Sequence, residues 1–228
     1  MEVVQTWTLK HPRVISLLGV THTFGGISLI VPWMKNKTIH RCLNAKKKEK
    51  GAKTPLIVNV AEGLAYLHAE GIVHGDLRGD NVLVDGNYKA VIADFGLTTF
   101  AHGHSRNYAS IRKGDSGWSA PELLNSKDGY SSRQTSASDV YAFAIVCIEI
   151  YLGRAPFNKE DGSMAFCRRV MDGLRPDRPE VPVRLDEQSH GELMRDDLWE
   201  VVSECWDGDK SKRPTARNAL RRLVSSRS

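Results

Sequence analysis

The chain has 228 residues, of which 41% are hydrophobic and 26% are charged, and its formal net charge is +5 at pH 7. This composition is that of a globular domain, and it excludes a disordered or fibrous chain. The N-terminal residues lack the basic and apolar regions of a signal peptide, and the longest apolar stretch, residues 140–151, is too short to span a membrane, so we expect neither export nor a membrane-spanning helix.

The first predicted element is a β-hairpin. Two apolar runs, residues 14–20 and 27–33, flank a polar turn around residues 23–26. The pattern then becomes helical, with Thr54 as the expected N-cap and Gly71 as the expected end of the helix.

Positive charge gathers in one run of lysines without interleaved aromatic residues. The run comprises Lys46, Lys47, Lys48, Lys50 and Lys53. It favours a solvated basic loop, with a localisation signal or a patch for an anionic partner as the alternative. We therefore expect no nucleic-acid partner.

Short β-like pieces follow the first helix, at residues 72–73, 82–84 and 89–93, and the turn formers Asp85, Gly86 and Asn87 separate the last two. A helix from Ser138 is apolar nearly all round, which is typical of a helix buried inside a larger fold, and Gly153 is its expected end. Further helices are predicted at residues 163–173, 192–206 and 216–225, the last with Thr215 as its N-cap.

The chain contains 4 cysteines, and no pair of them has the CxxC spacing of a zinc or redox site. They are Cys42, Cys147, Cys167 and Cys205. Widely spaced thiols of this kind indicate a reducing compartment, so we expect a cytoplasmic protein, with the nucleus as the alternative.

The most informative stretch is HGDLRGDNVLVD, residues 74–85, which is followed by Asp94 and its neighbours. Asp76 and Asn81 lie in one loop, and Asp94 ends the second strand of a hairpin that brings it towards them. Carboxylate and amide oxygens that converge in this way suit Mg²⁺, which completes its coordination with water and phosphate. Any one of these residues alone would be read as a turn cap, but their combined spacing favours a site.

These motifs resemble those of the eukaryotic-type protein kinases, whose catalytic loop HRDLxxxN is followed by DFG and then APE. The corresponding segments here are HGDLRGDN, Asp94-Phe95-Gly96 and Ala120-Pro121-Glu122. SDVYAF at residues 138–143 resembles the buried helix F of that family, and CWDGDKSKRPT at residues 205–215 resembles its closing segment. The resemblance extends from Glu2 to about Val224.

The resemblance implies an α+β, protein kinase-like fold with a mostly helical large lobe and a remnant of the β-rich small lobe. Residues 1–33 would be the small-lobe remnant, residues 34–224 the large lobe with the catalytic loop and activation segment, and residues 225–228 a tail. No GxGxxG or VAIK run occurs in the sequence, although both belong to the family pattern. We therefore expect residues 1–228 alone to transfer phosphate poorly or not at all.

The resemblance also implies roles for the loop residues. Asp76 would orient the substrate hydroxyl and accept its proton, while Asn81 and Asp94 would hold Mg²⁺. Arg78 matches a lysine that touches the transferring phosphate in Ser/Thr kinases, which favours Ser/Thr over Tyr substrates. ATP and Mg²⁺ are thus the implied cofactors, and a protein is the implied substrate.

For the nucleotide, the resemblance makes Val31 the gatekeeper and places the adenine-reading hinge at residues 32–34. Pro32 offers its carbonyl and Met34 its N–H, so the hinge keeps the backbone groups it needs. Leu83 belongs with these residues as part of the nucleotide-binding surface.

Four further residues would have structural roles by the same resemblance. Glu2 falls where the helix-C glutamate belongs. Glu122 and Arg213 would form the buried pair that anchors the activation segment, and Asp139 would brace the catalytic loop from helix F.

One departure from the family is Gly75, which replaces the arginine that pairs with a phosphorylated activation loop. His-Gly-Asp also resembles small-molecule phosphotransferases of the aminoglycoside and choline kinase kind, but the motifs at Ala120, Ser138 and Lys212 argue against them. The other alternative is a pseudokinase-like binding module. The joint presence of both aspartates and Asn81 favours an enzyme, since a binding module has no physical need for them.

Overall fold

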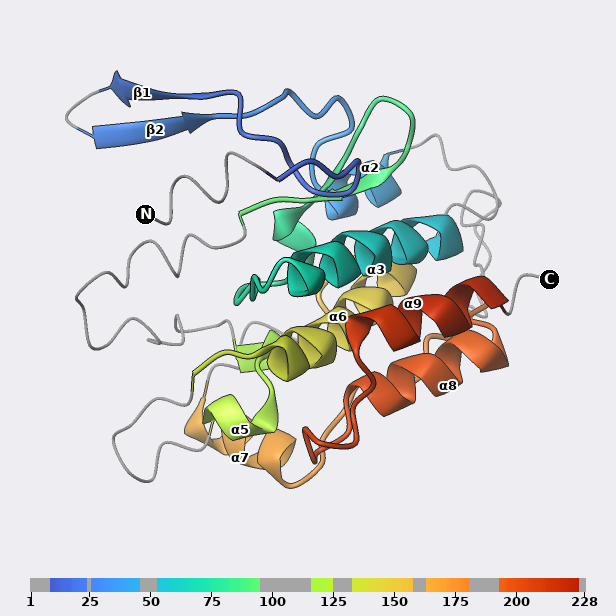
Figure 1. Ribbon diagram of the computed structural model, residues 1–228. Coiled ribbons are helices and arrows are strands. Elements are labelled where there is room, and N and C mark those ends of the chain that lie inside the picture. The colour runs from blue at the N-terminus through green and yellow to red at the C-terminus, as the bar shows by residue number, and fades with distance from the viewer. Residues whose placement is uncertain are drawn as a thin grey trace.

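The computed structural model describes residues 9–23, 26–45, 53–94, 116–124, 133–157, 163–180 and 193–225. Within these ranges the strands lie in the N-terminal half of the chain, and the later elements are helices. The fold is therefore α+β, as the sequence predicts. Figure 1 shows one β-hairpin set apart at the upper left, with the helices gathered below it.

The projecting hairpin consists of β1 (Gly19–Thr23) and β2 (Gly26–Ile30), which pair antiparallel. The prediction of a strand at residues 14–20 is wrong in most of its length. Val14 instead forms a parallel bridge with Ile92, and the Ile15 N–H donates to the Ile92 carbonyl at 2.8 Å. The Val14 and Ile15 side chains are buried in the core, and their apolar character is why the sequence pattern predicts a strand here.

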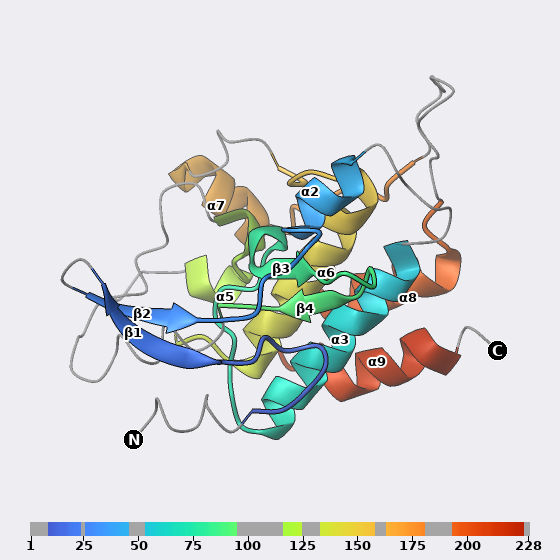
Figure 2. The same cartoon turned by 90° about the horizontal axis from the view of Figure 1, so that it is seen from above.

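A second antiparallel hairpin is formed by β3 (Val82–Val84) and β4 (Ala90–Ile92), close to the predicted pieces. Its turn is closed by Asp85, whose side chain accepts hydrogen bonds from the N–H groups of Asn87 at 2.8 Å and Lys89 at 2.9 Å. The predicted strand at residues 72–73 is wrong, because the chain there is irregular. Figure 2 shows β3 and β4 lying over the helices, while β1 and β2 extend to one side.

Two long helices, α3 (Lys53–Ala69) and α6 (Ser136–Leu152), form the centre of the helical part. Nearly every side chain of α6 is buried, which confirms the prediction from its apolar circumference. Its first turn is closed by a capping box of Thr135 and Ser138, and its end by Gly153 at φ 68°. Thr54 is not an N-cap, since it lies inside α3 and its hydroxyl is 3.2 Å from that of Tyr151.

Two further helices, α8 (Asp196–Cys205) and α9 (Ala216–Ser225), pack near this centre, and α9 lies along α3 in Figure 1. The shorter helices are α2 (Ile39–Asn44), α5 (Pro121–Leu124) and α7 (Met164–Met171). The sequence predicts α7, α8 and α9 but not α2 and α5. In the part of the chain that the structure describes, no helix is both long and apolar enough to cross a membrane.

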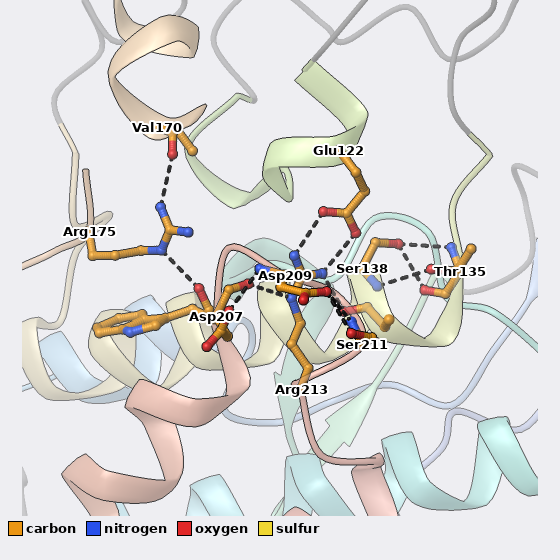
Figure 3. Close-up of polar contacts among 11 residues, drawn as sticks. Glu122, Thr135, Ser138, Val170, Arg175, Asp207, Asp209, Ser211 and Arg213 are labelled. Carbon is orange, nitrogen blue, oxygen red and sulfur yellow. Dashed lines mark hydrogen bonds and ion pairs between the residues drawn. The ribbon is translucent and has the colours of Figure 1, made fainter. Parts of the chain in front are cut away.

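An ion pair between a buried arginine and a partly buried glutamate joins α5 to the segment before α9 (Figure 3). The Arg213 guanidinium, whose side chain is 0% exposed, donates to both carboxylate oxygens of Glu122 at 2.8 Å. Its other donors reach the carbonyls of Asp207 at 2.8 Å and Ala137 at 3.0 Å. Burial alone would raise the pKa of Glu122, but the hydrogen bonds and charge of Arg213 outweigh burial and lower it. One arginine thus fastens α5 to the ends of α6 and α8.

Glu122→Gln is expected to lower the free energy of unfolding by about 2 to 3 kcal/mol, because it leaves a buried guanidinium without its counter-charge. Since the pKa of Glu122 is lowered in the folded state, this stability is present above the ordinary value of 4.5 and is lost as the pH falls through the lower folded value. The measurement is denaturant unfolding at several pH values. The control is Glu204→Gln, which removes a half-exposed pair with Arg222 and should change stability by less than about 1 kcal/mol. Equal effects of the two variants would contradict a special role for the buried pair.

Candidate active site

The loop at residues 74–81 lies between α3 and β3, and a carboxylate of α6 holds its first residues. Asp139 is 2% exposed, and its Oδ2 accepts from the His74 N–H at 2.7 Å and from His68 Nε2 at 2.9 Å. Its Oδ1 accepts from the Gly75 N–H at 2.9 Å. A buried carboxylate is stable only when donors surround it, and the loop supplies two of these three donors.

The His74 side chain connects this loop to the end of β4. Its Nε2 donates to the Ala93 carbonyl at 3.1 Å, and its Nδ1 accepts from the Asp76 N–H at 3.1 Å. One ring nitrogen must therefore donate while the other accepts, which requires the neutral imidazole. Complete burial is the main cause that lowers the pKa of His74, in agreement with this neutral form.

Asp76, Asn81 and Asp94 gather at one edge of this arrangement. Asn81 Nδ2 donates to the Asp76 carbonyl at 2.7 Å and to its Oδ2 at 3.1 Å. The Ala93 N–H donates to the Asn81 carbonyl at 2.9 Å, so Asp94 follows directly after a residue bonded to the loop. Asp94 has φ 57°, a left-handed conformation that is uncommon for a residue with a side chain and that clusters at functional sites.

Oxygen ligands of the kind that Mg²⁺ prefers are therefore present at this edge. The Asp94 carboxylate is exposed, and the Asn81 amide offers one oxygen. One or two such ligands with water and phosphate suffice for Mg²⁺, so the residues fit this ion. Among the described residues, no group of three or more His, Cys, Asp or Glu side chains forms a protein-only metal site.

Gly75 has φ 80°, a conformation that glycine adopts without strain. From the sequence, Gly75 is significant as a lost arginine and as part of the His-Gly-Asp motif. The structure adds that its N–H binds Asp139 in a backbone geometry unfavourable for most other residues.

The Arg78 side chain connects the loop to the segment before α5. Its guanidinium stacks over the Trp118 ring at 4.4 Å from the ring centroid and donates to Asp80 Oδ2 at 3.1 Å. Trp118 ends a 3₁₀ helix, η2 (Ser116–Trp118), which comes shortly before Ala120 and α5. The sequence does not predict this stacking, which orients Arg78 within the site.

The predicted hinge, residues 32–34, follows β2 and comes before α2. Met34 and Leu83 are partly buried and pack against the core, Pro32 is half-buried, and Val31 is exposed. The Asn36 N–H donates to the Val84 carbonyl at 3.1 Å. The structure thus joins the segment just after the hinge to the strand that carries Leu83.

Several predicted positions lie outside the described residues. They are Glu2, Phe95, Gly96 and most of the lysine run, Lys46 to Lys50. The roles expected at these positions stay predictions.

One acidic residue that no sequence motif identifies is Glu149. This side chain is 0% exposed in α6 and accepts hydrogen bonds from Gly79, Trp118 and His40. A charged residue in the apolar second half of a buried helix is the signal that could have identified it, since such a charge needs partners.

The chain belongs to the protein kinase family, because the protein kinase domain matches residues 1–224. It is 29% identical over 220 residues to receptor-interacting serine/threonine-protein kinase 1 of Homo sapiens, covering 91% of this chain and 31% of that protein. It is 31% identical over 214 residues to tyrosine-protein kinase SPK-1 of Girardia tigrina, covering 91% of this chain and 41% of that protein. A mitogen-activated protein kinase kinase kinase of Pyricularia oryzae is 30% identical over 215 residues, covering 93% of this chain and 13% of that protein. The chain therefore spans less than half the length of each of these relatives.

Protein kinase domains in general use ATP with Mg²⁺ and act on proteins.

Asp139→Asn is expected to destabilise the fold by about 2 kcal/mol or more, because an amide removes the charge and cannot accept from all three donors. Asp172→Asn, at an exposed carboxylate after α7, should change stability by less than about 0.5 kcal/mol. Thermal and denaturant unfolding of both variants would check this. Similar values for the two variants would show that the Asp139 carboxylate does not hold the loop.

Proposed function

We propose that this domain transfers the γ-phosphoryl group of ATP to a serine or threonine hydroxyl of a protein substrate. The observation that carries the proposal is the contact between Asn81 and Asp76 in a loop that Asp139 holds from α6. Family membership supports the reaction class, and this geometry supports the roles of the individual residues.

Asp76 would orient the attacking hydroxyl and accept its proton. Its carboxylate is exposed, and the hydrogen bond from Asn81 Nδ2 to Oδ2 fixes one of its oxygens. That bond turns the donor end of the amide towards Asp76, which leaves the Asn81 oxygen as the ligand for Mg²⁺. Bound Mg-ATP would supply the phosphoryl group, with Asn81 and Asp94 as the protein ligands of the metal.

The preference for Ser/Thr rests on Arg78. A cation at this position can approach the transferring phosphate, and its stacking on Trp118 restricts where the guanidinium points. The names of the relatives include serine/threonine kinases and a tyrosine kinase, so residue type is part of the proposal.

We further propose that residues 1–33 are a small-lobe remnant, residues 34–224 the large lobe and residues 225–228 a tail. The projecting β1–β2 hairpin, and the bonds to β3 of the segment just after the hinge, support the first boundary. By the same comparison with protein kinases, the nucleotide would contact Val31, Pro32, Met34 and Leu83.

We propose that the protein resides in a reducing compartment, which is the cytoplasm, with the nucleus as the alternative. Cys147 and Cys205 are free thiols, and burial raises the pKa of both, that of Cys205 to about 12. Such thiols stay protonated and inert at neutral pH, which suits a structural role in a reducing environment.

Asp76→Asn should lower transfer by roughly 10²- to 10⁴-fold while the fold is retained, because the general base is lost. Asp94→Asn should in addition weaken Mg-ATP binding, since it removes a metal ligand. Both are measured as transfer to a Ser/Thr peptide, in a protein with a kinase small lobe fused ahead of Glu2. Asp177→Asn, at an exposed carboxylate, is the matched control. Unchanged transfer by Asp76→Asn would refute the assignment.

Residues 1–228 alone should bind Mg-ATP weakly and transfer phosphate slowly, because the sequence has no glycine-rich loop or VAIK lysine. The loss of one preorganised hydrogen-bond donor typically lowers the rate of an enzyme roughly 10²- to 10³-fold. Calorimetric titration with Mg-ATP and a transfer assay test this. Rescue by the fused small lobe would support an enzyme. Micromolar binding with steady turnover by the 228 residues would show that they need no further segment, and failure of the fusion would favour a binding module.

A further inference from the structure

The Glu149 carboxylate connects three segments that are far apart in the sequence. Its Oε2 accepts from the Gly79 N–H at 2.8 Å and from Trp118 Nε1 at 2.8 Å, and its Oε1 lies 3.0 Å from His40 Nε2. Gly79 begins the 3₁₀ helix η1 (Gly79–Asn81) of the catalytic loop, and His40 lies on α2. Phosphoryl transfer as described above makes no use of this carboxylate.

Burial of a charged carboxylate without a counter-charge is strongly unfavourable, so a charged Glu149 needs a cation as its partner. His40 is the titratable cation in contact with Glu149 among the described residues. The fit is tight as well, because a Cβ added at Gly79 would lie 2.3 Å from His40 Nε2. A glycine is therefore required at position 79 while the imidazole occupies this place.

We propose that Glu149 is a positioning residue for the catalytic loop, and that protonated His40 is the cation that holds it in place. Because Gly79 lies between Asp76 and Asn81, the proposal rests on the proposed phosphoryl transfer. Asp139 fixes the start of the loop at His74 and Gly75, and Glu149 fixes its end.

The charges around His40 favour its protonated form. The hydrogen bond with Glu149 is the largest cause that raises the pKa of His40; burial opposes it, and Asp80 adds to it. The elements that pack most extensively against α2 are α6, which contributes Glu149, η1, which contributes Asp80, and β3, which has no titratable side chain. On α2 itself the neighbouring titratable side chains are those of Arg41 and Cys42.

The sign of the pH effect follows from the raised pKa. The imidazolium stabilises the arrangement fully below the ordinary value of 6.5, and this contribution is lost as the pH rises through the higher folded value. Neutral His40 can still donate one hydrogen bond, but Glu149 then lacks its counter-charge. The loop end at Gly79 should loosen, and Asn81 with it.

The first experiment is an NMR titration of residues 1–228, which follows the His40 ring and the indole N–H of Trp118. His40 is expected to titrate above 6.5, and Trp118 should shift with the same midpoint because both bind Glu149. Glu149→Gln should lower the midpoint of His40, while Glu70→Gln at an exposed site should not. A His40 midpoint at or below 6.5, or one that Glu149→Gln leaves unchanged, would overturn the proposal.

The second experiment compares pH profiles in the protein used for the Asp76 test. Wild-type kcat should fall as the pH rises through the His40 midpoint, whereas His40→Gln should have a lower kcat at low pH and lack this step. Glu149→Gln should reduce kcat about tenfold or more, since it misplaces the loop that carries Asp76 and Asn81. Glu70→Gln should behave as wild type. Wild-type kinetics in Glu149→Gln, or an unchanged step in His40→Gln, would refute the positioning role.

Failure of the proposed function can be told apart from failure of this inference. If Asp76→Asn leaves transfer unchanged, the function fails, and the NMR titration still decides whether His40 and Glu149 are coupled. If Asp76→Asn abolishes transfer while the His40 and Glu149 variants behave as wild type, the function stands and the inference fails.

Discussion

The Asp139 carboxylate accepts hydrogen bonds from His68 and from the N–H groups of His74 and Gly75, and the geometry of the site depends on these contacts. They fix the start of the catalytic loop against a helix that cannot move without disrupting the core. His74 then reaches the Ala93 carbonyl, so the same carboxylate indirectly places the end of β4. Loop and strand end are thereby held as one unit.

The helix α6 supplies this support because it is buried nearly all round and yet carries two carboxylates. Asp139 near its start and Glu149 near its end contact opposite ends of one loop. Buried charges of this kind give little net stability, but each has one low-energy set of donors and so specifies a single arrangement. The Arg213–Glu122 pair acts similarly on α5, and Arg213 also binds the Ala137 carbonyl at the start of α6.

Sequence patterns predict the elements whose signals are local. The apolar circumference of α6, the Thr215 cap of α9 and the turn at Asp85 each depend on neighbouring residues, and the structure contains all three. The strand predicted at residues 14–20 fails because the backbone of Val14 and Ile15 bonds to Ile92 of β4, which comes much later in the chain. The short helices α2 and α5 give too few turns for a periodic signal.

The candidate site likewise has a part that the sequence predicts and a part that it does not. Asp76, Asn81 and Asp94 have motif spacing that can be read from the sequence, and the structure shows how the backbone brings them together. The contacts of Glu149 join residues separated by 109 positions to His40 and 70 positions to Gly79, so local patterns could not predict them. They depend on how α2 and the catalytic loop pack on α6.

Amide hydrogen exchange at His74, Gly75 and Gly79 tests most directly whether the two carboxylates of α6 hold the catalytic loop. If they do, these loop amides should exchange nearly as slowly as amides inside α6, and only with opening of the core. Gly86, in the exposed turn between β3 and β4, should exchange fast in the same spectrum. Exchange of the three loop amides as fast as that of Gly86 would contradict the central role of Asp139 and Glu149.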